Sequence, residues 1–236
     1  MDLDESEDPN AKEAFKFFCR HLVAVRMTYA LVDEKGKDVG KPQVVVYSGF
    51  VVEVRGAWLI ATAGHNLHNL EECLLKIRVI GCQILDNFGP GQVSNFPIPF
   101  NLADAPRFYM FQDDSKLRLG LEEGLDFGLI WLNSNNVQLL KANNVVPVSD
   151  DNMRHAANAS EKWHAIVGFP ECFQSTTFLP NGRITHDFSP VIASVEELDP
   201  PPDDLTETQY PRFVGKLADA ANVDIAGMSG GPIIGF

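Results

Sequence analysis

The sequence predicts an all-β protein, a sandwich or barrel of short strands. The chain of 236 residues contains 16 Phe together with many Val and Ile, residue types that are enriched in strands. Short apolar segments alternate with turns that contain Gly, Pro or Asn, and no long segment has helical periodicity. A chain of this length can bury a sizeable core, either as one large domain or as two small ones.

In the first half of the chain, the expected strands are separated by short polar turns. Residues 1–13 are acidic and poor in apolar residues, so we expect them to be disordered. Residues 33–38 are polar and contain a glycine, which predicts a hairpin loop. The expected elements are a short helix at 14–20, strands at 21–32, 43–54, 57–61, 74–85, 107–111 and 127–132, and one helical turn at 66–70.

The second half begins after a polar, Asn-rich segment at 133–144, which we interpret as the connection between the two halves. Residues 198–204 contain three consecutive prolines, which remove the donors of a sheet ladder, and therefore predict an exposed loop. The strands expected in this half are 145–148, 162–168, 172–179, 190–196, 210–214 and 233–236.

Charge and cysteine usage limit the possible partners and the compartment. The net charge is −13, from 32 acidic and 19 basic side chains, which opposes binding to nucleic acid or to anionic lipid. The N-terminus lacks the features of a secretory signal, and no apolar segment is long enough to cross a membrane. The four cysteines are far apart, which favours free thiols, and we therefore expect a cytoplasmic protein.

A serine close to the C-terminus lies in a glycine-rich turn. Ser229 stands in the segment 224–236, DIAGMSGGPIIGF, with Gly227 before it and Gly230 and Gly231 after it. Glycine permits backbone torsions that other residues resist, so such a turn can present the hydroxyl beside converging N–H groups. Acyl-transfer chemistry needs this combination of a nucleophile and donors for an oxyanion. The alternative is a tight turn between two strands with a solvated serine.

His65 is the histidine with the most suggestive surroundings. It follows the apolar residues 58–61 and the small-residue corner 62–64, which places an imidazole at the end of a strand. Histidine is the side chain best suited to proton transfer near neutral pH. One alternative is a histidine that only forms structural hydrogen bonds. Another is a metal site with His68 and Cys73 or Cys82, but no close Cys/His pair has zinc-site spacing, so we expect no metal.

Asp126 is the candidate acid because it precedes the apolar strand 127–132, whereas most other carboxylates lie in solvated clusters. A carboxylate at the start of a buried strand needs a partner, since an unpaired buried charge is costly. An imidazole N–H is a suitable partner. The alternatives are a turn or helix cap and a salt bridge to Arg or Lys.

Three segments occur together in the order His, Asp, Ser. They are SGFVV at 48–52 leading to ATAGH at 61–65, then LDFGL at 125–129 and GMSGGP at 227–232. In these segments the chain resembles the trypsin/chymotrypsin-like serine peptidases, and it is most similar to their bacterial, non-zymogen members. The resemblance spans roughly residues 20–236, although between the motifs it rests only on the strand pattern.

The resemblance implies two packed antiparallel β-barrels with the active site between them, the first over 14–135 and the second over 136–236. It implies a serine endopeptidase that acts on polypeptides without a cofactor. His65 would be the general base, Asp126 would orient its imidazole, and Ser229 would attack the scissile carbonyl. The backbone N–H groups of Gly227 and Ser229 would form the oxyanion hole.

The sequence departs from the animal members of this family in two ways. Met228 stands where zymogen-type members carry an acidic residue that pairs with a new N-terminus, so activation by cleavage is not expected. The usual disulfides are also missing. The resemblance places the floor of the substrate pocket at Val223 or at the adjacent Asp224. Val223 would favour substrates with small or apolar side chains and Asp224 those with basic ones, and we favour Val223.

Few residues follow the serine motif, so the resemblance also implies a second barrel that lacks its last strands. We expect the native polypeptide to continue beyond Phe236, where a further domain could follow. Two other functions are compatible with the motifs. One is a protease-like binding or regulatory module whose site is not assembled, and the other is an esterase that uses the same three residues.

Overall fold

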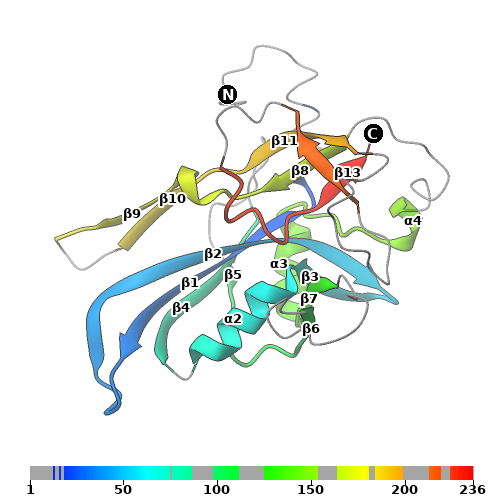
Figure 1. Cartoon of the computed structure of the whole chain (residues 1–236). Coiled ribbons are helices and arrows are strands. Elements are labelled where there is room, and N and C mark those ends of the chain that lie inside the picture. Colours follow the sequence, from blue (N-terminus) through cyan, green and yellow to red (C-terminus); the bar gives the residue numbers. More distant parts are fainter. Residues whose placement is uncertain are drawn as a thin grey trace, which may run out of the picture.

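The computed structural model describes residues 13, 16, 19–74, 76–86, 98–111, 125–153, 164–180, 184–198, 213–218 and 224–235. Over these residues the protein consists mainly of β-strands, and the named strands pair antiparallel (Figure 1). The prediction of an all-β, antiparallel fold is confirmed. Disorder was expected over residues 1–13; residues 1–12 lie outside the described residues, and Glu13 is helical. The pocket residue Val223, residues 199–204 of the expected proline loop and the terminal Phe236 also lie outside the described residues.

The first half of the chain forms a seven-stranded sheet in the order β5-β4-β1-β2-β3-β7-β6. Its long strands β1 and β2 form a hairpin that extends to one side in Figure 1. The expected strands are present, and β2 begins at Asp38 rather than at 43. The bounds are β1 Leu22–Val32, β2 Asp38–Val54, β3 Ala57–Thr62, β4 Ile77–Leu85, β5 Ile98–Pro99, β6 Arg107–Phe111 and β7 Asp126–Trp131.

Helix α2 is longer than the sequence pattern suggested, and helix α3 was not expected. Helix α2 spans Gly64–Leu74, three turns where one was expected, because Leu67 and Leu70 are spaced to bury the same face against the sheet. Helix α3, Ser134–Ala142, occupies the segment interpreted as a polar connection. The side chain of Asn133 caps this helix by accepting from the N–H of Asn136, so an asparagine that suggested a loop starts a helix.

The second half forms a four-stranded sheet in the order β12-β11-β8-β13 and a separate two-stranded hairpin of β9 and β10. Its strands are β8 His164–Gly168, β9 Gln174–Phe178, β10 Ile184–Phe188, β11 Val191–Glu197, β12 Gly215–Leu217 and β13 Ile233–Gly235, with the short helices α4 Asp150–Met153 and η3 Glu171–Phe173. Strands β10 and β12 were not expected, and residues 213–214 of the strand expected at 210–214 lie outside any strand. The strand expected at 145–148 is reduced to one bridge, between Val52 and Val148.

The described strands form open sheets. Strands β5 and β6 remain at opposite edges of the seven-stranded sheet, and β12 and β13 remain at the edges of the four-stranded one. Among the described residues, therefore, the two halves do not close into the barrels that the resemblance implied. No helix in the described part of the chain is both long and apolar enough to cross a membrane.

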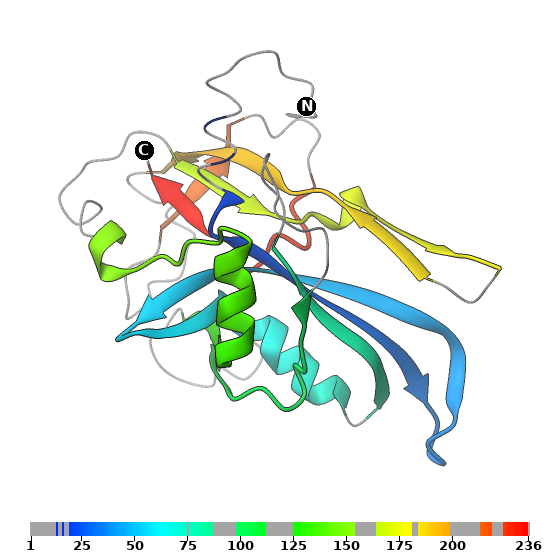
Figure 2. The same ribbon diagram turned by 180° about the vertical axis from the view of Figure 1, so that it is seen from behind.

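Strand β1 contributes side chains to two hydrophobic cores, because successive side chains of a strand point to opposite faces. Val23, Val25 and Met27 belong to the core inside the first sheet, which α2 and α3 also line. Leu22 and Ala24 pack on the other face, in a second core with residues of β8 and the segment after it, including Phe169. The second sheet therefore lies against β1 and β2 (Figure 2), and this packing brings the serine segment to the start of α2.

Candidate active site

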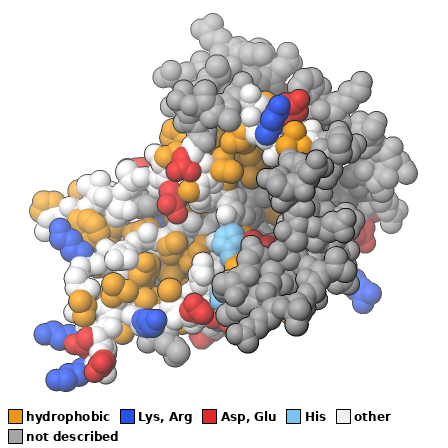
Figure 3. Space-filling view, in the orientation of Figure 1, with side chains coloured by type: hydrophobic (Ala, Val, Ile, Leu, Met, Phe, Trp, Pro, Cys, Tyr) orange, Lys and Arg blue, Asp and Glu red, His pale blue; other side chains and the backbone are white. Residues whose placement is uncertain are grey.

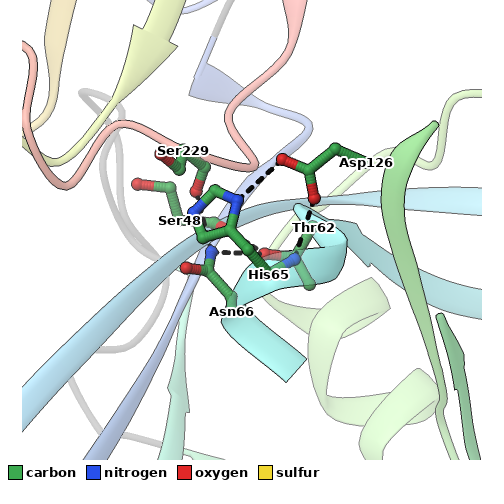
Figure 4. Close-up of polar contacts among 6 residues, drawn as sticks. All are labelled: Ser48, Thr62, His65, Asn66, Asp126 and Ser229. Carbon is green, nitrogen blue, oxygen red and sulfur yellow. Dashed lines mark hydrogen bonds and ion pairs between the residues drawn. The ribbon is translucent and has the colours of Figure 1, made fainter. Parts of the chain in front are cut away.

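The structure pairs His65 with Asp126 in a two-point contact. The Nδ1 of His65 lies 2.7 Å from Oδ2 of Asp126, and the backbone N–H of His65 donates to Oδ1 of the same carboxylate at 2.8 Å (Figure 4). Because both carboxylate oxygens bind the same residue, the ring and its backbone are held together. The predicted base and the predicted acid are therefore in contact.

Local structure explains this contact. Asp126 is the first residue of β7, and His65 is the second residue of α2, so a carboxylate from the sheet meets the N–H groups at the start of a helix. Negative charge is favourable at a helix N-terminus. Gly64 permits the close approach, since a Cβ there would clash with the carbonyl oxygen of Met110 and lie 2.9 Å from that of Phe127.

The two partners shift each other's pKa. The hydrogen bond that Asp126 accepts from the His65 ring raises the pKa of His65 above its ordinary value of 6.5, although burial of the ring acts in the opposite direction. Burial raises the pKa of Asp126, but the hydrogen bonds from the His65 side chain and backbone outweigh burial, so this pKa lies below its ordinary value. At neutral pH the carboxylate is therefore ionised and can stabilise an imidazolium. The His65 side chain is 29% exposed, and histidine side chains are visible near the centre of the face in Figure 3.

This pKa shift predicts the pH dependence of reactions at the site. A general base must be neutral, so the rate should rise as pH increases through the pKa of His65. Because Asp126 raises that pKa, we expect the midpoint of a kcat/KM profile to lie above 6.5. The measurement is a kcat/KM series between pH 5 and 9, with the His65 ring followed by NMR over the same range. A midpoint at or below the ordinary histidine value would contradict this expectation.

The serine lies in two consecutive tight turns that share Met228. The N–H of Met228 donates to the carbonyl of Ile225 at 3.0 Å, and the N–H of Gly231 donates to the carbonyl of Met228 at 2.9 Å. The third residues of these turns, Gly227 and Gly230, have φ values of +89° and +91°. A positive φ at the third position alone is typical of a type II turn and explains the glycines. Ser229 is the second residue of the second turn and is exposed.

The serine turn fits closely onto the first sheet at Gly230. A Cβ at this position would lie 2.6 Å from the carbonyl oxygen of Ser48 and 2.7 Å from the backbone nitrogen of Ala63, and it would also clash with the hydroxyl of Thr62. The glycine therefore lets the serine turn lie against Ser48 in the interior of β2 and against the end of β3, shortly before His65.

We expect Gly230→Ala to weaken both folding and the site. The added methyl group meets backbone atoms that cannot move aside, and the positive φ is unfavourable for alanine. Overpacking and strain of this kind typically cost about 1–3 kcal/mol. Urea unfolding measures the cost. Gly81→Ala in β4 is the control, because a Cβ there meets nothing within 4 Å. Equal stability of the two variants would contradict the close fit.

The turn geometry orients the two N–H groups that were predicted to form an oxyanion hole. The carbonyl of Ala226 accepts from the N–H of Glu171 at 2.7 Å, and the carbonyl of Met228 is held by Gly231. In a trans peptide the N–H points opposite to the carbonyl, so the N–H groups of Gly227 and Ser229 point away from these partners. Within the described residues, neither N–H donates a hydrogen bond.

One buried hydroxyl group connects the serine turn to the first sheet, and a second one supports it from within that sheet; the sequence analysis assigned neither a role. The hydroxyl of Ser48 donates to the carbonyl of Gly227 at 2.9 Å and accepts from the N–H of Phe169 at 3.0 Å. The hydroxyl of Thr62 donates to the carbonyl of Ser48 at 2.8 Å. Both residues lie in apolar strands, where a buried hydroxyl group needs a hydrogen-bond partner. Their position in such strands was the feature of the sequence that could have indicated a role.

Met228 is almost completely buried, with 1% of its surface exposed, and it packs against Gly168 of β8. An apolar side chain thus anchors the serine turn. Asp224, one of the two candidates for the pocket floor, is exposed, and its carboxylate accepts from the N–H of Ala226 at 2.9 Å. In the structure this carboxylate therefore caps the turn.

The described residues contain no group of three or more His, Cys, Asp or Glu side chains that could hold a metal ion. His68 lies one turn along α2 from His65, where its Nε2 is 3.5 Å from a carboxylate oxygen of Glu72. The cysteines are free thiols, Cys19 buried, Cys82 half-buried, and Cys73 and Cys172 exposed.

Comparison with known proteins gives little further information. No protein-family model matches the sequence, and no curated protein matches it significantly. One solved structure to which the fold is similar is a thermostable serine protease from an extremophilic microorganism. The two chains are 11% identical, the match covers 92% of this chain and 79% of the other, and the TM-score is 0.36. At this level of similarity, the functional assignment depends on the geometry of the site itself.

Proposed function

We propose that the protein is a serine endopeptidase that hydrolyses peptide bonds through His65, Asp126 and Ser229. The observation that carries the proposal is the two-point contact between Asp126 and His65, at 2.7 and 2.8 Å, with the serine turn packed directly beside it. A carboxylate that binds both the Nδ1 and the backbone N–H of a histidine fixes the ring and leaves Nε2 as its reactive nitrogen. In Figure 4, Ser229 lies on the side of the ring away from Asp126.

In this proposal Ser229 is the nucleophile and His65 the general base. The Oγ of Ser229 attacks the carbonyl carbon of the scissile bond, and Nε2 of His65 takes the hydroxyl proton. The imidazolium then gives this proton to the leaving amine, which leaves an acyl group on Ser229. Water, activated by the same histidine, releases the acyl group. Asp126 stabilises the imidazolium in both steps, as expected for a carboxylate whose pKa is low.

The free N–H groups of Gly227 and Ser229 would bind the oxyanion of the tetrahedral intermediate. The type II turn at 225–228 supports this role, because it holds the Ala226 carbonyl against Glu171 and turns the next N–H away from it. A donor of this kind typically lowers the barrier by roughly 3 kcal/mol. Because Met228 is already buried, we propose that the turn assembles without cleavage of a precursor.

The test uses two substrates that separate peptidase from esterase activity. The protein is incubated at pH 8 with unfolded casein and with p-nitrophenyl acetate, and the casein products are sequenced by mass spectrometry. We expect internal cleavage of casein, with a shared residue type before the cut. Small or apolar residues there would favour a pocket at Val223, and basic ones a pocket at Asp224. Ester hydrolysis without casein cleavage would replace peptidase by esterase, and no reaction with either would overturn the proposal.

A further inference from the structure

Asn66, the residue after the proposed base, contacts the proposed nucleophile directly. The Nδ2 of its side chain donates to the backbone carbonyl of Ser229 at 3.0 Å, although 163 residues separate the two positions. The same nitrogen donates to the hydroxyl of Thr62 at 3.2 Å. Figure 4 shows Asn66 beside His65 on the first turn of α2, directed toward the serine turn.

The neighbouring hydrogen bonds determine which way the amide of Asn66 faces. The hydroxyl of Thr62 has one proton, which it donates to the carbonyl of Ser48, so it can only accept from Asn66. The carbonyl of Ser229 is likewise only an acceptor. Both partners therefore require the NH₂ end of the amide, and the orientation follows from the network. A carboxylate at this position would offer no donor and would repel both acceptors.

The hydrogen bond from Asn66 acts on the nucleophile more directly than the other contacts of the turn. Ser48 holds the carbonyl of Gly227, and Gly231 holds that of Met228, on the N-terminal side of the serine. Within the described residues, Asn66 provides the side-chain hydrogen bond to Ser229 itself. Fixing that carbonyl fixes the plane of the following peptide and restricts rotation of the Ser229 backbone.

We propose that Asn66 is a positioning residue for the nucleophile: the side-chain amide of Asn66 holds Ser229 in position relative to His65. This inference rests on the proposed peptidase function. Asn66 and His65 are consecutive residues on one rigid helical turn, so one element positions both the base and the nucleophile. The hydrogen bond runs from α2, in the first half of the chain, to the segment before β13, and it links the two halves of the protein at the reacting groups.

The test compares Asn66→Ala with Asn69→Ala, the same substitution at an exposed position of the same helix. Alanine favours a helix and adds no charge, so we expect both variants to fold. A third variant, Asn66→Asp, keeps the shape but removes the donor. Each variant is tested for reaction with a fluorophosphonate, for kcat and KM, and for hydrogen exchange of residues 224–231.

We expect Asn66→Ala and Asn66→Asp to lower the labelling rate and kcat by roughly tenfold to a hundredfold, because misplacement of a reacting group by about 1 Å has an effect of this size. The KM should change less than about twofold, because the substitution does not remove a contact with the substrate. Exchange at residues 224–231 should become faster in both. Asn69→Ala should match the wild type in every assay. If Asn66→Asp is labelled and exchanges at the same rates as the wild type, the positioning role is overturned and the peptidase proposal is left intact. Failure of the wild type to label or cleave would overturn both.

Discussion

Ser229→Ala is expected to abolish peptide hydrolysis and covalent labelling by a fluorophosphonate. Without the Oγ no acyl-enzyme can form, and loss of the nucleophile in such a site lowers kcat by roughly 10⁵–10⁶-fold. Because Ser229 is exposed and its hydroxyl forms no hydrogen bond within the described residues, the change should leave the stability of the fold nearly unaffected. Casein cleavage and intact-mass analysis after phosphonate treatment measure the two effects.

The matched control for this variant is Ser175→Ala, which removes a hydroxyl from an exposed position on β9. We expect this variant to retain the wild-type rate and to gain one phosphonate group per chain. Cleavage or labelling of Ser229→Ala at the wild-type rate would place the nucleophile elsewhere and remove Ser229 from the mechanism.

Asp126→Asn is expected to lower kcat by roughly 10⁴-fold while the fold is retained. An amide has nearly the same shape as a carboxylate, but it presents an NH₂ group that cannot accept the ring N–H of His65. The ring would then change tautomer or turn away, and the developing imidazolium would lose its counter-charge. The hydrogen bond that raises the pKa of His65 would also be lost, so the pH midpoint of the residual activity should move down.

Asp187→Asn, an exposed position on β10, is the matched control because it removes the same charge far from the site in sequence. Its rate should equal that of the wild type. An Asp126→Asn variant with unchanged kcat and an unchanged pH midpoint would show that the observed contact with His65 is a structural cap, which was one alternative that the sequence left open.

The strands could be predicted from the sequence because their signal is local. The apolar segments at β1, β3, β6 and β7 were located to within about one residue. The helices were less predictable because their signal depends on neighbours in space. Leu67 and Leu70 have helical spacing, but the length of α2 depends on burial against β6 and β7. For α3, the sequence does not show whether Asn133 caps a helix or belongs to a loop.

In the candidate site, too, some residues could be predicted from local sequence and others could not. His65, Asp126 and Ser229 could be proposed because each follows or precedes a recognisable apolar strand or glycine turn. Ser48 and Asn66 could not be assigned a role, because their partners in the serine turn are brought close only by packing of the second sheet on β1 and β2. Thr62 could not be assigned one either, because it acts through Ser48 and Asn66. In a sequence, a serine or threonine in an apolar strand indicates that a partner exists, but it does not identify that partner.

The most direct test of the account is a crystal structure of the protein after reaction with a small phosphonate. The account predicts one adduct, bonded to Oγ of Ser229, with the phosphoryl oxygen about 2.7–3.1 Å from the backbone nitrogens of Gly227 and Ser229. The Nδ1 of His65 should remain on Asp126. An adduct on another residue, or a phosphoryl oxygen directed away from both N–H groups, would contradict the assignment of this site to acyl transfer.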